Sequence, residues 1–184
     1  MSLESAIARR RSTRAFADAP LALADVAQLL WSAQGVTDQE GHRAAPSAGA
    51  LYPLELYLVV ARVEGVSPGV YRYIPARHAL ELVRAGDVRS RLMAAALDQT
   101  CVGAGAAHLV FSAVYERTTA KYGERGTRYV HMDVGHAGQN VYLQAEALGL
   151  GTVAVAAFDD ARVREILGLP GNEHPLYIMP VGRR

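Results

Sequence analysis

The sequence predicts an α+β fold, in which several helices pack on one central β-sheet. Helical and strand-like patterns are mixed along the chain, without the strict alternation that is typical of a parallel α/β fold. Of the 184 residues, 51% are hydrophobic and 20% are charged, which is typical of a globular protein with a buried core. No repeat, low-complexity tract or linker divides the chain. We therefore expect a single domain over residues 1–184.

The first elements are two helices and a strand. A helix is predicted over residues 2–10, with the Ser2 hydroxyl as its N-terminal cap. A second helix begins after Pro20, because apolar residues then recur at helical spacing. Residues 54–61 are rich in β-branched and aromatic side chains, which indicates a buried strand. The polar stretch over 35–47 lies between these two elements and is interpreted as a functional loop.

A hairpin, a helix and a strand follow. Two strands over 69–74 and 78–84 enclose a turn that begins with Pro75. A helix capped by its first residue is expected over 87–97. The apolar run over 107–115 predicts the next strand.

The strongest helical pattern covers residues 128–148. Apolar side chains recur there at steps of three and four, and Gly149 stops the helix. Gly135 and Gly138 each disfavour a helix by roughly 0.8–1.0 kcal/mol relative to alanine, so they indicate close approach of a ligand or of another backbone, from this chain or from a second subunit. We expect a second subunit to bury the apolar stripe, which consists of Val130, Val134, Ala137, Val141, Ala145 and Leu148.

The C-terminal part alternates between strands and a helix. A strand is expected over 151–157 and a last strand over 176–181. Between them, Asp159 or Asp160 caps a helix that ends near Gly168.

Charge and cysteine content exclude several classes of protein. The chain has 19 basic and 18 acidic residues, so no global field attracts nucleic acid or anionic lipid. Its one cysteine cannot form an intrachain disulfide, which fits a reducing compartment. No apolar run approaches the roughly 18 residues of a membrane span. We expect a cytoplasmic protein with no nucleic-acid partner and no membrane partner.

Two segments suggest ligand contacts. Four arginines and Ser12 lie together over residues 9–14, and guanidinium groups bind phosphate bidentately while a hydroxyl adds a neutral donor. The alternative is a solvated basic segment. The segment over 45–55 has small residues between Pro46 and Pro53, directly before a strand, and these would let the backbone approach a flat ligand closely. An ordinary loop would have the same composition.

Lys121 is the only lysine in the chain, and Tyr122 follows it. An ammonium and a phenol are both tunable proton carriers, so the pair is either catalytic or a solvated surface feature. We expect no metal site, because His131 and His136, with Asp133 between them, point roughly 140° apart on a helix.

Together these segments resemble the FMN-dependent nitroreductase superfamily, and specifically its SagB-type (thiazole/oxazole-forming dehydrogenase) branch. The resemblance implies a homodimer with a central, mostly antiparallel sheet flanked by helices and a long central helix at the dimer interface. The matching pieces follow the family's order, over residues 10–14, 45–55, 121–123, 147–151, 156–159 and 180–184.

The resemblance also implies that FMN binds noncovalently between the subunits. Lys121 and Tyr122 would supply the proton chemistry that accompanies hydride transfer. The residues expected at the phosphate and ribityl end are Arg10, Arg11, Ser12, Arg14 and Arg183. Those expected along the isoalloxazine are Pro46, Ser47, Ala48, Ala156 and Ala157.

The implied activity is hydride transfer through flavin N5, with NAD(P)H, a small molecule or a peptide as substrate. One alternative is an azoline dehydrogenase of a peptide-modifying complex, and another is a flavin-binding protein without turnover of its own. Ala50 replaces the asparagine of many nitroreductases, and Ala156-Ala157 replaces their Glu-Gly pair. Both departures fit the SagB-type branch better than the nitroaromatic reductases.

Overall fold

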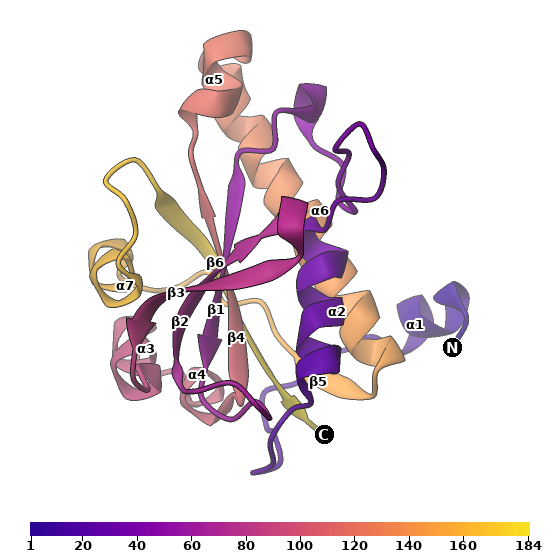
Figure 1. The fold of residues 1–184 in the computed structure, drawn as a ribbon, viewed down its shortest axis with the longest axis vertical. Coiled ribbons are helices and arrows are strands. Elements are labelled where there is room, and N and C mark those ends of the chain that lie inside the picture. Colours follow the sequence, from indigo (N-terminus) through magenta and orange to yellow (C-terminus); the bar gives the residue numbers. More distant parts are fainter.

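The computed structural model describes residues 1–184. A six-stranded sheet lies at the centre, and helices cover both of its faces (Figure 1). The strand order is β3-β2-β1-β4-β6-β5, and every neighbouring pair is antiparallel. The α+β fold with a mostly antiparallel sheet is therefore confirmed.

The elements have the following bounds. The strands are β1 (Leu54–Val60), β2 (Gly69–Ile74), β3 (Ala79–Ala85), β4 (Ala107–Ala113), β5 (Leu150–Thr152) and β6 (His174–Arg183). The helices are α1 (Leu3–Arg9), α2 (Leu23–Gln34), α3 (Arg89–Ala95), α4 (Thr100–Ala104), α5 (Glu116–Tyr122), α6 (Arg125–Ala147) and α7 (Asp160–Leu167). Two short 3₁₀ turns are η1 (Ala48–Ala50) and η2 (Pro75–Arg77).

Strand β1 has a core on each face, which explains its continuous apolar run. All seven of its residues are buried. Leu56 and Leu58 belong to the core that α2 and α6 cover. Tyr57 and Val59 belong to the second core, which α3, α4 and α7 cover on the opposite face. Figure 1 shows these helices in two separate layers.

The apolar stripe of α6 faces the sheet of its own chain. Ala137 and Val141 are fully buried in the core that β1, β4 and β6 share. The prediction that a second subunit covers this stripe is therefore wrong, because the sheet already covers it. Gly138 also faces the sheet, since an added Cβ would lie 3.4 Å from the Tyr177 ring. Gly135 lies on the exposed face, with nothing within 4 Å of an added Cβ.

The strand predicted over 151–157 is shorter than expected, because β5 ends at Thr152. The register of β5 on β6 would next pair Val153 with Pro180. Proline has no N–H to donate, so the ladder breaks there. Pairing resumes only as a single bridge between Val155 and Ile178.

Two short helices, α4 and α5, are missing from the sequence prediction. The strand predicted over 107–115 ends at Ala113, and α5 begins three residues later. Helix α5 contains Thr118 and Thr119, which are weak helix formers. It packs closely on the start of α6 at Gly126, where an added Cβ would lie 2.9 Å from the Thr119 nitrogen. Lys121 and Tyr122 therefore end a helix that tertiary packing holds in place.

The predicted caps and the hairpin agree with the structure in most details. The Ser2 hydroxyl accepts the Ser5 N–H at 3.3 Å, and Asp159 accepts the Arg162 N–H at 3.0 Å. Helix α3 begins at Arg89 with Val88 at the cap position, so the predicted cap at Asp87 lies one residue too early, although Asp87 Oδ1 accepts the Arg89 N–H at 3.0 Å. The helix ends at Ala95, two residues before the predicted end. None of the helices combines the length and the apolar character that a membrane span requires.

Candidate functional site

The segment after α1 runs beside the C-terminal half of α6. The Thr13 N–H donates to the Thr152 carbonyl at 2.9 Å, which ties the segment to β5. Ser12 Oγ lies 3.0 Å from the hydroxyl of Tyr142, and that hydroxyl accepts the Ala154 N–H at 2.8 Å. When the phenol donates its one proton to Ser12, the Ser12 hydroxyl proton is available to a ligand. Sequence reasoning missed Tyr142, which is an ordinary helical tyrosine in its local pattern.

Three arginines of this segment have no acidic partner. The Arg10 guanidinium lies 5.2 Å from the centre of the Tyr142 ring. Arg11 donates only to the backbone carbonyls of Ala8 and Arg10, at 3.1 and 2.8 Å. Arg14 is exposed. None of these three arginines forms an ion pair within 4 Å, although the charge of Arg11 helps to lower the pKa of Glu146. Their guanidinium groups can therefore still bind an anion.

The other arginines nearby hold the two ends of the chain on α6. The carboxylate of Glu146, only 2% exposed, pairs with Arg184 and lies 3.3 Å from Arg9 Nε. The hydrogen bond from Arg184 lowers the pKa of Glu146, and the charge of Arg9 adds to this effect. Arg183 donates through Nε to the Pro20 carbonyl at 3.1 Å. Arg9 and Arg184 thus have a structural role, and Arg183 is tied to the chain just before α2.

Asp133 of α6 anchors the loop that contains Pro46–Ala48. The Ser47 hydroxyl donates to Asp133 Oδ2 at 2.6 Å, and the Ala48 N–H donates to Oδ1 at 3.4 Å. Ser47 Oγ in turn accepts the Tyr52 N–H at 3.0 Å. Burial raises the pKa of the Asp133 carboxyl, although the bonds from Ser47 and Ala48 oppose that effect. The Ser47 hydroxyl proton is thus used inside the protein, where it fixes the loop.

Lys121 and Tyr122 meet this loop at Gly49. Gly49 has a φ of +63°, and an added Cβ would lie 2.7 Å from the Tyr122 hydroxyl and 3.1 Å from Lys121 Nζ. The Tyr122 ring packs edge-on against Tyr129 of α6 at a centroid distance of 5.2 Å. The structure therefore brings the predicted proton carriers to the predicted flavin loop, although about 70 residues separate them in the sequence.

A cavity of about 270 Å³ opens beside the loop on the exposed face of α6. Its polar groups include the Asp133 carboxylate and the ring of His136, which lies 3.4 Å from the Pro46 carbonyl through Nδ1. The lining residues are Pro46, Ser47, Ala48, Tyr129, Met132, Asp133 and His136.

The predicted site residues lie against α6 in two groups, one at Asp133 and one at Tyr142. Asp133 and Tyr142 are nine residues apart, which is about 14 Å along a helix and about 180° around it. The exposed face with Gly135 lies between them. Ala156 and Ala157 follow Ala154 and are exposed, so they continue from the Tyr142 group. Within one protomer, the arginine segment over residues 10–14 and the Pro46–Ala48 loop are therefore on opposite flanks of this face.

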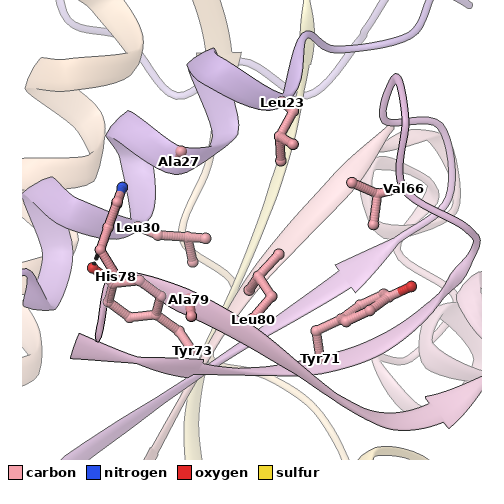
Figure 2. Close-up of a pocket in the computed structure, with 9 residues that line it drawn as sticks. All are labelled: Leu23, Ala27, Leu30, Val66, Tyr71, Tyr73, His78, Ala79 and Leu80. Carbon is pink, nitrogen blue, oxygen red and sulfur yellow. Dashed lines mark hydrogen bonds between the residues drawn. The ribbon is translucent and has the colours of Figure 1, made fainter. Parts of the chain in front are cut away.

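A second cavity, of about 340 Å³, lies between α2 and the β2–β3 hairpin (Figure 2). Its polar pair is Tyr73 and His78, whose hydroxyl and Nδ1 are 2.8 Å apart. Burial raises the pKa of Tyr73 to about 12. No arginine or lysine lines this cavity, so it offers no site for a phosphate, and none of the predicted site residues lies in it.

Comparison with known proteins identifies the family of the chain. The family model described as Nitroreductase family matches residues 7–183. The nitroreductase-like protein MJ1384 of Methanocaldococcus jannaschii is 50% identical over 184 residues, which are 100% of this chain and 92% of MJ1384. The solved structure of a nitroreductase-like protein from Anabaena variabilis has a TM-score of 0.87 at 34% identity, over 98% of this chain and 38% of that chain.

A further relative is a peptide-processing protein. The microcin B17-processing protein McbC of Escherichia coli is 33% identical over 132 residues. The match covers 69% of this chain and 48% of McbC, so the chain spans about half the length of that relative. The chain therefore belongs to the nitroreductase family, and its similarity to McbC bears out the SagB-type branch.

Proposed function

We propose that this protein is an FMN-dependent oxidoreductase whose residues 1–184 form one FMN-binding domain. The observation that carries the proposal is the set of three arginines without an ion-pair partner, Arg10, Arg11 and Arg14, beside the hydroxyl of Ser12. Each charge-assisted hydrogen bond from these groups to a phosphate contributes roughly 1.5–3 kcal/mol. The residues present therefore fit the phosphate end of FMN.

The ring end of FMN fits the small residues. The backbone N–H groups of Ala156 and Ala157 donate to no backbone acceptor of the protein, so they can serve a ligand. The Pro46–Ala48 loop is held by Asp133, and its small side chains leave room for a flat ring. When bound, FMN supplies hydride transfer at N5, while the chain positions the ring and restricts access to it.

The working form that we propose is a homodimer. The exposed face of α6 separates the arginine group from the loop, so a second copy on this face would lie against both flanks. Gly135 leaves that face open for a partner backbone. Two equivalent sites would then form, each with the arginines of one subunit and the loop of its partner.

A second candidate function is azoline oxidation within a peptide-modifying complex. It is favoured by the similarity to McbC and by the contact of Lys121 and Tyr122 with the loop at Gly49. Removing two hydrogens from an azoline requires a base for the proton, and a lysine can release its proton whereas an arginine cannot. A flavin-binding protein without turnover would make no use of this pair.

The test is anaerobic reduction of the purified, FMN-loaded protein, followed by flavin absorbance. Bleaching by NADH or NADPH supports the oxidoreductase proposal. Bleaching by a thiazoline peptide, with oxidation of the thiazoline to thiazole in the product mass, supports the second candidate. Lys121→Arg should retain FMN and lose most of the substrate-driven bleaching. A protein that binds FMN but is bleached by none of these reductants would be a binding protein only.

A further inference from the structure

A buried carboxylate at the start of β1 connects the sheet to the helix that contains Lys121. The Glu55 residue is only 8% exposed. Its Oε2 accepts from Arg72 of β2 at 2.8 and 3.2 Å, and its Oε1 accepts from Arg117 of α5 at 2.6 Å. Glu55 therefore binds two arginines, which come from different elements.

Only one of these two arginines also holds the loop. Arg117 donates through Nη1 to the Tyr52 carbonyl at 3.1 Å, and no such bond links Arg72 to the loop. The loop needs this support, because Gly49, Ala50 and Tyr52 all have positive φ, a conformation that residues other than glycine adopt with strain. Arg117 thus joins the sheet to the end of the strained loop.

Arg117 and Lys121 are four residues apart on α5, so they lie on the same face of that helix. Arg117 contacts the loop at Tyr52, and Lys121 lies against it at Gly49. Helix α5 has only seven residues, so its own hydrogen bonds fix its position weakly. Packing at Gly126 fixes it on the α6 side, and the bonds of Arg117 fix it on the loop side.

We propose that Arg117, held by Glu55, is a positioning residue that sets the Lys121 ammonium against the 49–52 loop. The inference rests on the proposed function in that it takes this loop to border the flavin. Arg117 itself touches neither the loop cavity nor the arginine group. Its role is therefore to orient α5.

The test uses the fact that Lys121 is the only lysine. Reductive methylation with ¹³C-formaldehyde gives one dimethyl-lysine NMR signal, separate from that of the chain's amino terminus. In Arg117→Gln without FMN, we expect this signal to move from its wild-type position toward that of free dimethyl-lysine. Arg72→Gln removes the other partner of the same carboxylate and should leave the signal in place. Substrate-driven flavin reduction should fall at least about tenfold in Arg117→Gln only, with FMN affinity unchanged within about twofold.

Two results would overturn the proposal: a wild-type signal in Arg117→Gln, or an equal displacement in Arg72→Gln. The Arg117 side chain is 38% exposed, so its replacement is compatible with folding, and Arg117→Met, which keeps the aliphatic stem, serves as a second variant. The NMR comparison needs no flavin. A protein that binds no FMN would therefore refute the proposed function and still report on the position of Lys121.

Discussion

The buried histidine of β4 should make the stability of the fold depend on pH. His108 is fully buried, and its Nε2 lies 2.6 Å from the Val102 carbonyl, while no partner bonds its Nδ1. Burial is the main cause that lowers the pKa of His108 to about 4, although the hydrogen bond to the Val102 carbonyl opposes it. The unfolded chain has the ordinary value of about 6.5.

Between these two values the unfolded state binds more protons than the folded state. The free energy of unfolding should therefore be fully retained above pH 6.5 and fall as the pH drops from about 6.5 to about 4. A difference of about 2.5 between the two pKa values corresponds to a loss of about 3 kcal/mol at about 1.36 kcal/mol per pKa unit. That loss is a large fraction of the 5–15 kcal/mol that is typical of a native protein.

Urea unfolding followed by circular dichroism measures this loss at pH 7.0, 5.5 and 4.5. His108→Gln cannot take up the proton, so its stability should fall less than that of the wild type across this range, by about 2–3 kcal/mol. His174→Gln, which removes an exposed histidine of β6, is the control for the loss of a histidine elsewhere in the fold. Identical pH dependence in His108→Gln and wild type would refute the reasoning.

Three further substitutions test separate parts of the account. Gly135→Arg fills open space on the surface of the protomer, so the protomer should still fold, yet light scattering should give a mass near 19.7 kDa instead of that of the dimer proposed for the wild type. A variant that is still dimeric would contradict the proposed interface. Gly49→Ala adds a Cβ at positive φ and 2.7 Å from the Tyr122 hydroxyl, so calorimetry should show that the free energy of unfolding falls by about 1–2 kcal/mol. An unchanged melting temperature would contradict the close contact at Gly49. Tyr142→Phe removes the hydrogen bonds to Ser12 and Ala154, so titration should show FMN binding about fivefold weaker than in the wild type. Wild-type affinity in this variant would show that Tyr142 does not support the site.

The local sequence pattern predicted the elements that depend on neighbouring residues alone. The hairpin and the long helix depend on alternation, turn residues and apolar spacing, and all of these are read from neighbouring residues. The early end of β5 depends instead on Pro180, which is 28 residues further along the chain than Thr152. Helix α5 depends on close packing at Gly126 more than on its own threonine-rich sequence.

Periodicity identified the buried face of α6 and could not say what buries it. The spacing is the same whether the sheet or a second subunit covers Ala137 and Val141. Gly135 and Gly138 are likewise equivalent in the sequence, although one faces solvent and the other faces Tyr177.

The candidate site was predicted in pieces by residue type, because arginines, small loop residues and a lone lysine are visible without a fold. Their supports, Asp133 and Glu55, were not predicted. Their roles depend on tertiary contacts of each carboxylate with a distant hydroxyl or guanidinium.

The most direct test of the central claim is a titration of the flavin-free protein with FMN and riboflavin, for wild type and for two single-arginine variants. Arg10 has no acidic partner, whereas its neighbour Arg9 pairs with Glu146. We predict that wild type prefers FMN, that Arg10→Ala weakens FMN at least about tenfold and leaves riboflavin unchanged, and that Arg9→Ala changes FMN affinity less than about threefold. Equal weakening by the two variants, or wild-type protein that binds FMN no better than riboflavin, would contradict the claim that this arginine segment holds the FMN phosphate.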